Sequence, residues 1–523
     1  MNTAKLPFRI SVLLLVLLPA VYFFLLLFFN EYLLVRPLVQ IWLTRSWVAI
    51  LLFFLFLLWG IKTTSRLQSA KNFLFEPMSP LNLAMFRVIH FSLYFVLIVF
   101  LQMDVGKKMT MGYEYFPSEN RVAIPWAEWY SLHIPITPEI IDALAPVFNI
   151  SALMMFFGLF TRVSSIVYLI TAYYLFSVHQ MFGKVGCSHH LIWFPAILAF
   201  SNCGRMLSLD ALIRKYIFKK PVDETPSVKY GFPIKASILL LGIIYFFPGF
   251  WKLWNGGFDW IFRCNLTYQM YYKWASLNYW MPFFRIDNYP ALIVVGSLFA
   301  IAFELGFIFL AMKPAHRIWI ALTGTLMHTG IYLFMKISFF SLLLNYAVLI
   351  DWEKIFARVR KNKIVAHETA ETAAVPWKEI RGVLVITVIL LCGNLVLGMA
   401  KLISYPFACY PPFDAMVPHE TEHVYYEGYK TGELLLGSNQ IKERIFKHRP
   451  AYNLGRVEEI LIENHTGADS AAVQSGIRQI FVISEDYADF DSIVLYKIKH
   501  PLKPELKGEI KEKNRIGVFY PDK

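Results

Sequence analysis

Charged residues are scarce in this chain of 523 residues: Asp, Glu, Lys and Arg make up only 17% of it, against about a quarter in an ordinary soluble domain. Hydrophobic residues reach 57%, and the mean hydropathy is +0.48. This composition excludes an ordinary soluble globular protein and predicts a membrane protein with several spans. Cysteine is also sparse, with five residues, which excludes a disulfide framework as the basis of the fold.

Signatures of several enzyme and binding classes are missing as well. The chain contains no P-loop, no dinucleotide fingerprint and no G-x-S-x-G elbow. No acidic or thiolate residue stands at metal-ligand spacing from the adjacent His189 and His190, so no metal site is expected. The net charge of +13 comes from short basic clusters at the ends of apolar runs. Such clusters are typical of membrane orientation signals and do not indicate nucleic-acid binding.

Apolar runs, compared with the roughly 20 residues that a helix needs to cross a bilayer, predict about ten membrane spans. They lie at about residues 8–34, 47–61, 82–102, 140–159, 164–182, 190–200, 234–250, 291–312, 319–334 and 383–402, with a shorter run at 337–350. Two segments between runs, 112–135 and 251–285, are rich in Trp, Tyr and Phe. We interpret them as interfacial helices, and an aromatic belt that only anchors the protein is an equal alternative.

The composition divides the chain into three parts. Residues 1–75 form a two-helix membrane extension, residues 76–402 hold the other runs, and residues 403–523 are much more polar. Three runs in the last part are strand-like, at 460–463, 480–484 and 492–498. The predicted fold is therefore an all-α polytopic membrane bundle with interfacial helices and a small α/β domain at the C-terminal end.

Lysine and arginine predict the orientation of the chain. The basic clusters lie near residues 62–71, 205–220, 313–317 and 358–363. The positive-inside rule places all of them in the cytoplasm. The N-terminus is then cytoplasmic and the C-terminal domain extracytoplasmic, although Arg36 and Arg45 oppose the rule locally.

A lysine and two histidines stand between two apolar runs, in the stretch K-V-G-C-S-H-H of residues 184–190. Ionisable groups at membrane depth are costly, and they are functional candidates by default. Desolvation disfavours the ammonium form, so a neutral Lys184 could act as a base while His189 and His190 orient a substrate or relay protons. The alternative is a snorkelling lysine at a helix end beside interfacial histidines.

Three further runs carry ionisable residues. Glu304 lies in the middle of an apolar run, so we expect it to be protonated or paired with Lys252, Arg87 or His328. It would shape a site or pin helices together. His328 also lies mid-run, where a buried histidine with satisfied nitrogens is the alternative to a site residue. Arg87 lies one turn into its run and could snorkel instead of binding a substrate.

Five local patterns together resemble the vitamin K-dependent γ-carboxylase family and its bacterial relatives, the horizontally transferred transmembrane (HTTM) proteins. They are L-A-M-F-R-V at 83–88, K-x5-H at 184–190, S-L-D-A-L at 208–212, Y-F-F-P-G-F-W-K-L at 245–253 and M-H-T at 327–329. The patterns follow the family's order across residues 78–352, which is more than half of the chain.

The resemblance implies an enzyme that couples oxygenation of a lipophilic hydroquinone, reduced vitamin K or a relative, to carboxylation of glutamate in a protein or peptide. Oxygen and carbon dioxide are the implied co-substrates. Lys184 would deprotonate the hydroquinone, His190 would assist or orient it, and His328 would line the site. Ser188 and His189 stand where the family has two asparagines. The outer part is also smaller than in the animal enzymes, so the quinone half-reaction carries over better than the glutamate half.

Two other hypotheses stay open. The same fold could act on a different lipid or quinone without carboxylation, or the chain could be a non-enzymatic transporter or membrane assembly factor. Membrane lipids are expected partners in each case. Lys184 favours an enzyme over a transporter, and we find no inverted repeats or glycine-broken helix pairs of the kind that transporters use.

Overall fold

The computed structural model describes residues 63–110, 136–180, 189–221, 225–277, 280–359, 377–399, 405–407, 413–448, 451–463, 471–506 and 508–521. The predicted runs at 8–34 and 47–61, the aromatic segment 112–135 and Lys184 lie outside these residues. The chain divides into two compact units, residues 1–76 and 77–523. The described helix of the first unit is α4 (Thr63–Leu74).

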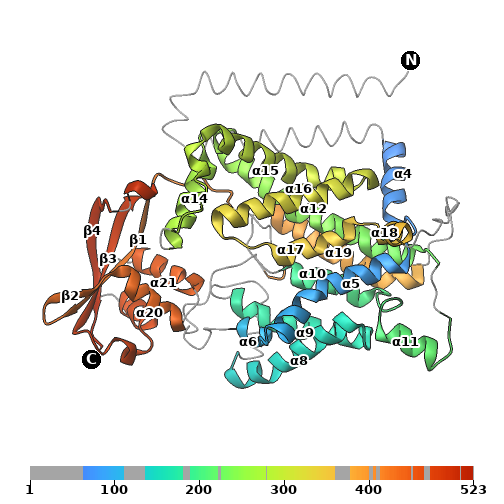
Figure 1. Ribbon diagram of the computed structural model, residues 1–523, viewed down its shortest axis with the longest axis horizontal. Coiled ribbons are helices and arrows are strands. Elements are labelled where there is room, and N and C mark those ends of the chain that lie inside the picture. The colour runs from blue at the N-terminus through green and yellow to red at the C-terminus, as the bar shows by residue number, and fades with distance from the viewer. Residues whose placement is uncertain are drawn as a thin grey trace, which may run out of the picture. The chain divides into compact units, whose positions relative to one another are not determined.

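Within the described ranges, seven helices are long and apolar enough to cross a membrane, so the chain is a multi-pass membrane protein. They are α5 (Pro80–Phe95, continued by the π-helical turn η1, Val96–Phe100), α8 (Pro138–Phe157), α9 (Thr161–Gln180), α12 (Val228–Gly256), α15 (Pro290–Ala311), α16 (Pro314–Met335) and α19 (Trp377–Met399), as Figure 1 shows. The predicted ten spans are thus confirmed only in part. The runs at 190–200 and 337–350 form shorter helices: α10 (His190–Phe200), α17 (Phe340–Leu343) and η5 (Leu344–Leu349).

Local sequence explains where several of the long helices begin and end. The hydroxyls of Ser79, Thr137 and Ser227 accept backbone N–H groups in the first turns of α5, α8 and α12. Such side-chain caps satisfy donors that have no partner inside the helix. Helix α8 ends at Gly158, whose φ of 69° suits a residue without a Cβ atom.

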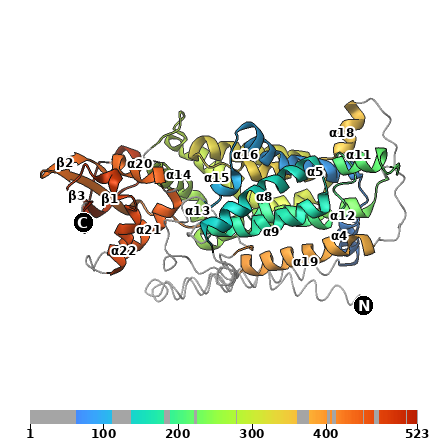
Figure 2. The ribbon, with the colours of Figure 1, turned by 90° about the horizontal axis from the view of Figure 1, so that it is seen from below.

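Helix α12 is the central helix of this part of the chain. Its apolar window is 89% buried, whereas the windows of α15, α16 and α19 are only 28% buried. Glycines let α15 approach α12 closely: a Cβ at Gly242 would lie 2.6 Å from Ile308, and one at Gly249 would lie 2.9 Å from Glu304. Small residues at helix contacts are the usual means of close packing in membranes. Helices α8 and α9 also contact one another and run side by side in both views (Figures 1 and 2).

The aromatic segment 251–285 is divided among several elements. Its first residues complete α12, and two short helices follow, α13 (Asp259–Phe262) and α14 (Asn265–Ser276). Trp260 and Trp274 are fully buried, and their indole N–H groups donate to the carbonyls of Phe413 and Phe334. These two tryptophans therefore hold protein segments together and do not form a lipid-facing belt.

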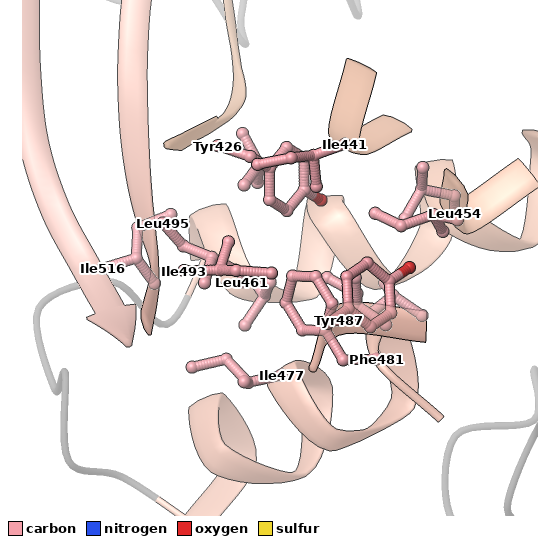
Figure 3. Packing of buried hydrophobic residues seen from close by; sticks show 14 of the residues in the cluster. Tyr426, Ile441, Leu454, Leu461, Ile477, Phe481, Tyr487, Ile493, Leu495 and Ile516 are labelled. Carbon is pink, nitrogen blue, oxygen red and sulfur yellow. The ribbon is translucent and has the colours of Figure 1, made fainter. Parts of the chain in front are cut away.

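The C-terminal part is an antiparallel sheet with helices. Its strands are β1 (Glu420–Lys430), β2 (Glu433–Leu436), β3 (Ser492–Pro501) and β4 (Glu512–Phe519), in the order β2-β1-β3-β4. Its helices are α20 (Ser438–His448), α21 (Ala451–Glu463) and α22 (Ala471–Ile480). Side chains from sheet and helices meet in one apolar core, in which Tyr426 and Leu495 lie near Leu461 and Ile477 (Figure 3).

Two of the three predicted strands are wrong. The run at 492–498 lies in β3, but 460–463 is the end of α21, and 480–484 spans the end of α22 and the turn after it. Leu454, Val457 and Leu461 are all buried, at a spacing of three and then four residues that marks one face of a helix. The predicted runs of four and five residues were too short to show this period. Because the sheet is antiparallel, the domain is α+β and not α/β.

Candidate functional site

A chain of hydrogen-bonded aromatic side chains is buried between α12, α16 and η5. The hydroxyl oxygen of Tyr245 lies 2.8 Å from His328 Nε2 and 2.5 Å from the hydroxyl oxygen of Tyr346. All three side chains are buried, and Tyr245 also stacks on Phe307 of α15 with ring centroids 4.6 Å apart. His328 Nδ1 is buried without a hydrogen-bond partner among the described residues. The His328 end of this hydrogen-bonded series can therefore accept a further donor or acceptor.

A second series of hydrogen-bonded side chains begins at Asn345, the residue before Tyr346. The Asn345 amide group donates to the Ser341 carbonyl, at 2.9 Å, so its Oδ1 faces His90 Nδ1 at 2.7 Å. An amide oxygen only accepts, so His90 Nδ1 carries the proton, and Nε2 of a neutral His90 is an acceptor. That Nε2 is buried without a partner in the described part of the chain. The Ser341 hydroxyl lies 3.0 Å from Nε2 of His190.

These two series of hydrogen-bonded side chains, the two polar chains, meet in one short segment, residues 341–346. Asn345 and Tyr346 are neighbours in η5, and they face His90 on α5 and Tyr245 on α12, respectively. Ser341 adds the contact with the first residue of α10, His190. A single turn-rich segment thus connects three histidines from three different helices.

An ion pair lies on α12 two turns beyond Tyr245. Lys252 Nζ lies 2.5 Å from Glu304 Oε1, and both side chains are buried. The ammonium group also lies 5.2 Å from the centre of the Trp260 ring. Glu304 was expected to pair with one of three cations or to be protonated, and its partner is Lys252. Its second oxygen, Oε2, is buried without a partner in the described part of the chain.

His189 lies beside two aromatic rings. Its ring centre is 5.4 Å from that of Tyr405 and 6.0 Å from that of Trp193. The Tyr405 hydroxyl donates to the Tyr173 carbonyl, and the Trp193 indole donates to the Pro406 carbonyl. Residues 405–407 are thereby tied to α9 and α10. The proposed base Lys184 precedes this histidine outside the described residues.

Arg87 is fully buried, so it does not snorkel. Its guanidinium group donates to the carbonyls of Met155 and Leu207, which ties α5 to the end of α8 and to the loop before α11 (Leu209–Tyr216). In the same region, the Asp210 carboxylate accepts the backbone N–H groups of Phe160 and Thr161. The family-like patterns at 83–88 and 208–212 therefore have a structural role at the beginning of α9.

Five members of the two polar chains were missing from the sequence-based site: His90, Tyr245, Ser341, Asn345 and Tyr346. Tyr245 begins the family-like pattern at 245–253, and His90 lies in the predicted span at 82–102, three residues after Arg87. Ser341, Asn345 and Tyr346 lie in the run at 337–350. This run is too short for a membrane span, so its polar residues were not selected as site candidates. Polar residues inside otherwise apolar runs were the signal that could have identified all five.

The arrangement supports hydrogen bonding and proton transfer among buried side chains. Neutral imidazole and phenol groups can bind a hydroxyl or carbonyl group and pass a proton along a chain. No three side chains of His, Cys, Asp or Glu within the described ranges are grouped as metal ligands. Comparison of the chain with protein-family models, with curated proteins and with solved structures found no match.

Proposed function

We propose that this protein is a membrane enzyme that binds and oxygenates a lipophilic hydroquinone, as the resemblance to the vitamin K-dependent γ-carboxylase family implies. The observation that supports this most is the set of three histidines joined by residues 341–346 inside apolar helices. A hydroquinone has two phenolic O–H groups on an apolar ring. His90 Nε2 and His328 Nδ1, which have no partner among the described residues, are suitable hydrogen-bond partners for such groups.

Lys184 is the proposed base. A neutral amine would take a phenolic proton, giving an ammonium group and the hydroquinone anion. Desolvation between the two apolar runs that flank Lys184 in the sequence would favour that neutral amine. His190 follows six residues later, and its bond to Ser341 holds its ring in one orientation. In the family's overall reaction, hydroquinone and oxygen become epoxide and water, and a glutamate γ-C–H bond is replaced by a bond to carbon dioxide. We propose the glutamate half as the second step, acting on a protein or peptide.

The first test is epoxide formation from reduced vitamin K by the purified protein in oxygenated proteoliposomes. Wild type is compared with Lys184→Ala and with the control Lys107→Ala. Lys107 is an exposed lysine paired with Asp142 at 2.8 Å, so its loss should leave the reaction unchanged. Removal of the base should lower epoxide formation by at least about a hundredfold.

Each outcome of this test has a distinct meaning. Epoxide from Lys184→Ala at the wild-type rate would refute the base assignment while leaving the substrate class intact. No epoxide from any of the three proteins would refute vitamin K as the substrate. If wild type forms epoxide, incorporation of labelled carbon dioxide into a glutamate-containing peptide then tests the carboxylation step.

We also propose that the N-terminus is cytoplasmic and that the C-terminal domain is extracytoplasmic. The basic clusters at the ends of the apolar runs support this orientation. Alkaline phosphatase fused after residue 523 should be active in a bacterial host, because the enzyme matures only outside the cytoplasm. An inactive phosphatase together with a fluorescent cytoplasmic reporter at the same position would reverse the orientation.

A further inference from the structure

A cavity of about 310 Å³ lies where α9 begins and α10 ends. Its lining includes the side chains of Thr161, Arg162, Arg205, Asp210 and Arg214. None of its lining residues belongs to the two polar chains or to the Lys252–Glu304 pair. The cavity is therefore a separate site, for which the proposed function gives no role.

The cavity has an excess of positive charge. Three arginines and one aspartate line it, and the carboxylate is already engaged. Asp210 accepts the backbone N–H of Phe160 at 2.7 Å and the backbone N–H and hydroxyl of Thr161 at 2.8 and 2.7 Å. Its hydrogen-bonding capacity is thus directed at the start of α9, and three guanidinium groups are left without a carboxylate partner in the described part of the chain.

The arginines differ in how much of their hydrogen-bonding capacity is used. Arg162 donates from Nη1 to the Ala199 carbonyl, at 2.8 Å. The side chains of Arg205 and Arg214 are half-buried and have no hydrogen bond or ion pair with any described residue. A guanidinium group offers several N–H donors in a planar fork, which matches the oxygens of a phosphate group. The two forks thus lie in one cavity with their donors available.

Exposed apolar side chains surround this end of the helices. Phe160 and Val163 of the lining are 61% and 62% exposed, and Leu212, Tyr216 and Phe218 on and after α11 are 51%, 68% and 65% exposed. In a multi-pass membrane protein such residues at helix ends belong at the boundary between acyl chains and headgroups. An anionic group at headgroup depth could therefore enter the cavity without leaving the membrane surface.

We infer that this cavity binds a phosphate group through Arg205 and Arg214, with Arg162 completing the positive lining. The apolar surroundings favour the headgroup of an anionic phospholipid as the source of the phosphate, and free phosphate is the other source. The inference is independent of the hydroquinone reaction, because it concerns other residues and a ligand that is not consumed.

The test measures phosphatidylglycerol binding to the full-length protein in detergent, by native mass spectrometry and by the rise in melting temperature. Phosphatidylcholine serves as the neutral lipid, and inorganic phosphate is titrated separately. The double variant Arg205→Gln/Arg214→Gln is compared with Lys215→Gln/Lys220→Gln, which removes the same charge from the same basic cluster outside the lining. The arginine variant should bind at least about tenfold more weakly, and the lysine variant should stay within about twofold of wild type.

The outcomes separate the two sources and decide the inference. Saturable phosphatidylglycerol binding that only the arginine variant loses supports a lipid headgroup site. An equal stabilisation by inorganic phosphate that needs the same arginines supports the phosphate site with a soluble source. Equal losses in both double variants, or no loss in either, would overturn the inference in favour of diffuse surface charge.

A conservative variant distinguishes loss of the binding group from loss of the fold. Arg214→Lys keeps the charge and the side-chain length but loses the planar fork. Its affinity should lie between that of wild type and that of the double glutamine variant. An affinity equal to wild type would show that the fork of Arg214 does not hold the phosphate.

Discussion

The helical part and the C-terminal domain of this protein differ in how deeply their ion pairs can be buried. In the helical part, the ion pair Lys252–Glu304 and the chain around Tyr245 are buried among apolar helices. In the C-terminal domain, the core is apolar, and an ion pair such as Arg444–Asp489 lies at its edge, with side chains 28% and 42% exposed. The ion pair of the helical part is thus shielded from solvent, whereas that of the C-terminal domain is in contact with water.

The physical reason is the solvent on the outside. Lipid chains are as apolar as leucine, so hydrophobicity does not distinguish the inside of a membrane bundle from its outside. Polar side chains are then satisfied only in the interior, where they find each other. In the C-terminal domain, an exposed charge finds water, and apolar side chains carry the packing. A fully buried ion pair therefore marks the interior of the helical part, and a cluster of apolar side chains marks the interior of the C-terminal domain.

The largest effect should come from breaking the buried ion pair. Glu304→Ala leaves the Lys252 ammonium group buried without a counterion, so we expect a loss of about 3–5 kcal/mol in unfolding free energy. Unfolding by sodium dodecyl sulfate in mixed micelles measures it. The double variant Lys252→Met/Glu304→Leu removes both charges and should recover most of the loss. If Glu304→Ala costs no more than an exposed pair, the contrast between the two regions fails.

A smaller effect is expected from the buried hydroxyl of Tyr245. Tyr245→Phe keeps the ring on Phe307 but leaves His328 Nε2 and the Tyr346 hydroxyl without their shared partner. The expected loss is about 1–3 kcal/mol, measured in the same micelles. Tyr346→Phe removes only the end of the chain and should cost less. Equal costs for the two variants would show that the chain does not extend to His328.

The histidine pair in the sheet gives a pH test of the C-terminal domain. His500 Nε2 lies 2.8 Å from His423 Nδ1, and burial, with the nearby charge of Lys442, lowers the pKa of His423 from 6.5 to about 3. The unfolded chain then binds a proton that the folded domain does not. Stability should be complete above pH 6.5 and fall as the pH drops toward 3, by at most about 1.4 kcal/mol per pH unit for this group.

Hydrogen exchange of β1 and β3 at several pH values measures this dependence in the intact protein. The control is His423→Gln, which cannot take up the proton and should flatten the slope in these strands. A slope unchanged by that substitution would assign the pH dependence to other groups.

The smallest effect is expected at the surface of the same domain. Arg444→Gln removes the ion pair with Asp489, whose N–O distance is 2.8 Å, and should cost about 0–1 kcal/mol because both groups remain hydrated. Hydrogen exchange of α20 measures it, with Lys108→Gln, at an exposed lysine of the helical part, as control. A loss as large as that of Glu304→Ala would show that water does not separate the two regions.

Part of the candidate site could be predicted from the sequence. Lys252, Glu304, His190 and His328 were selected because ionisable residues in apolar runs are costly, and the structure places all four in buried polar contacts. Asn345 was missed because its amide is uncharged and because the run around it is too short to show a helical period. Its importance comes from meeting His90, which lies 255 residues earlier in the chain.

The sequence alone determined that the chain crosses a membrane several times, because a run of about 20 apolar residues satisfies its backbone only as a spanning helix. It did not determine which cation meets Glu304, since Lys252, Arg87 and His328 were equal candidates until the packing of α12 against α15 selected one. Nor did it distinguish strand from helix at 460–463, where four apolar-rich residues fit both periods. Contacts between distant segments decided these questions, because their energies depend on neighbours that the local sequence does not contain.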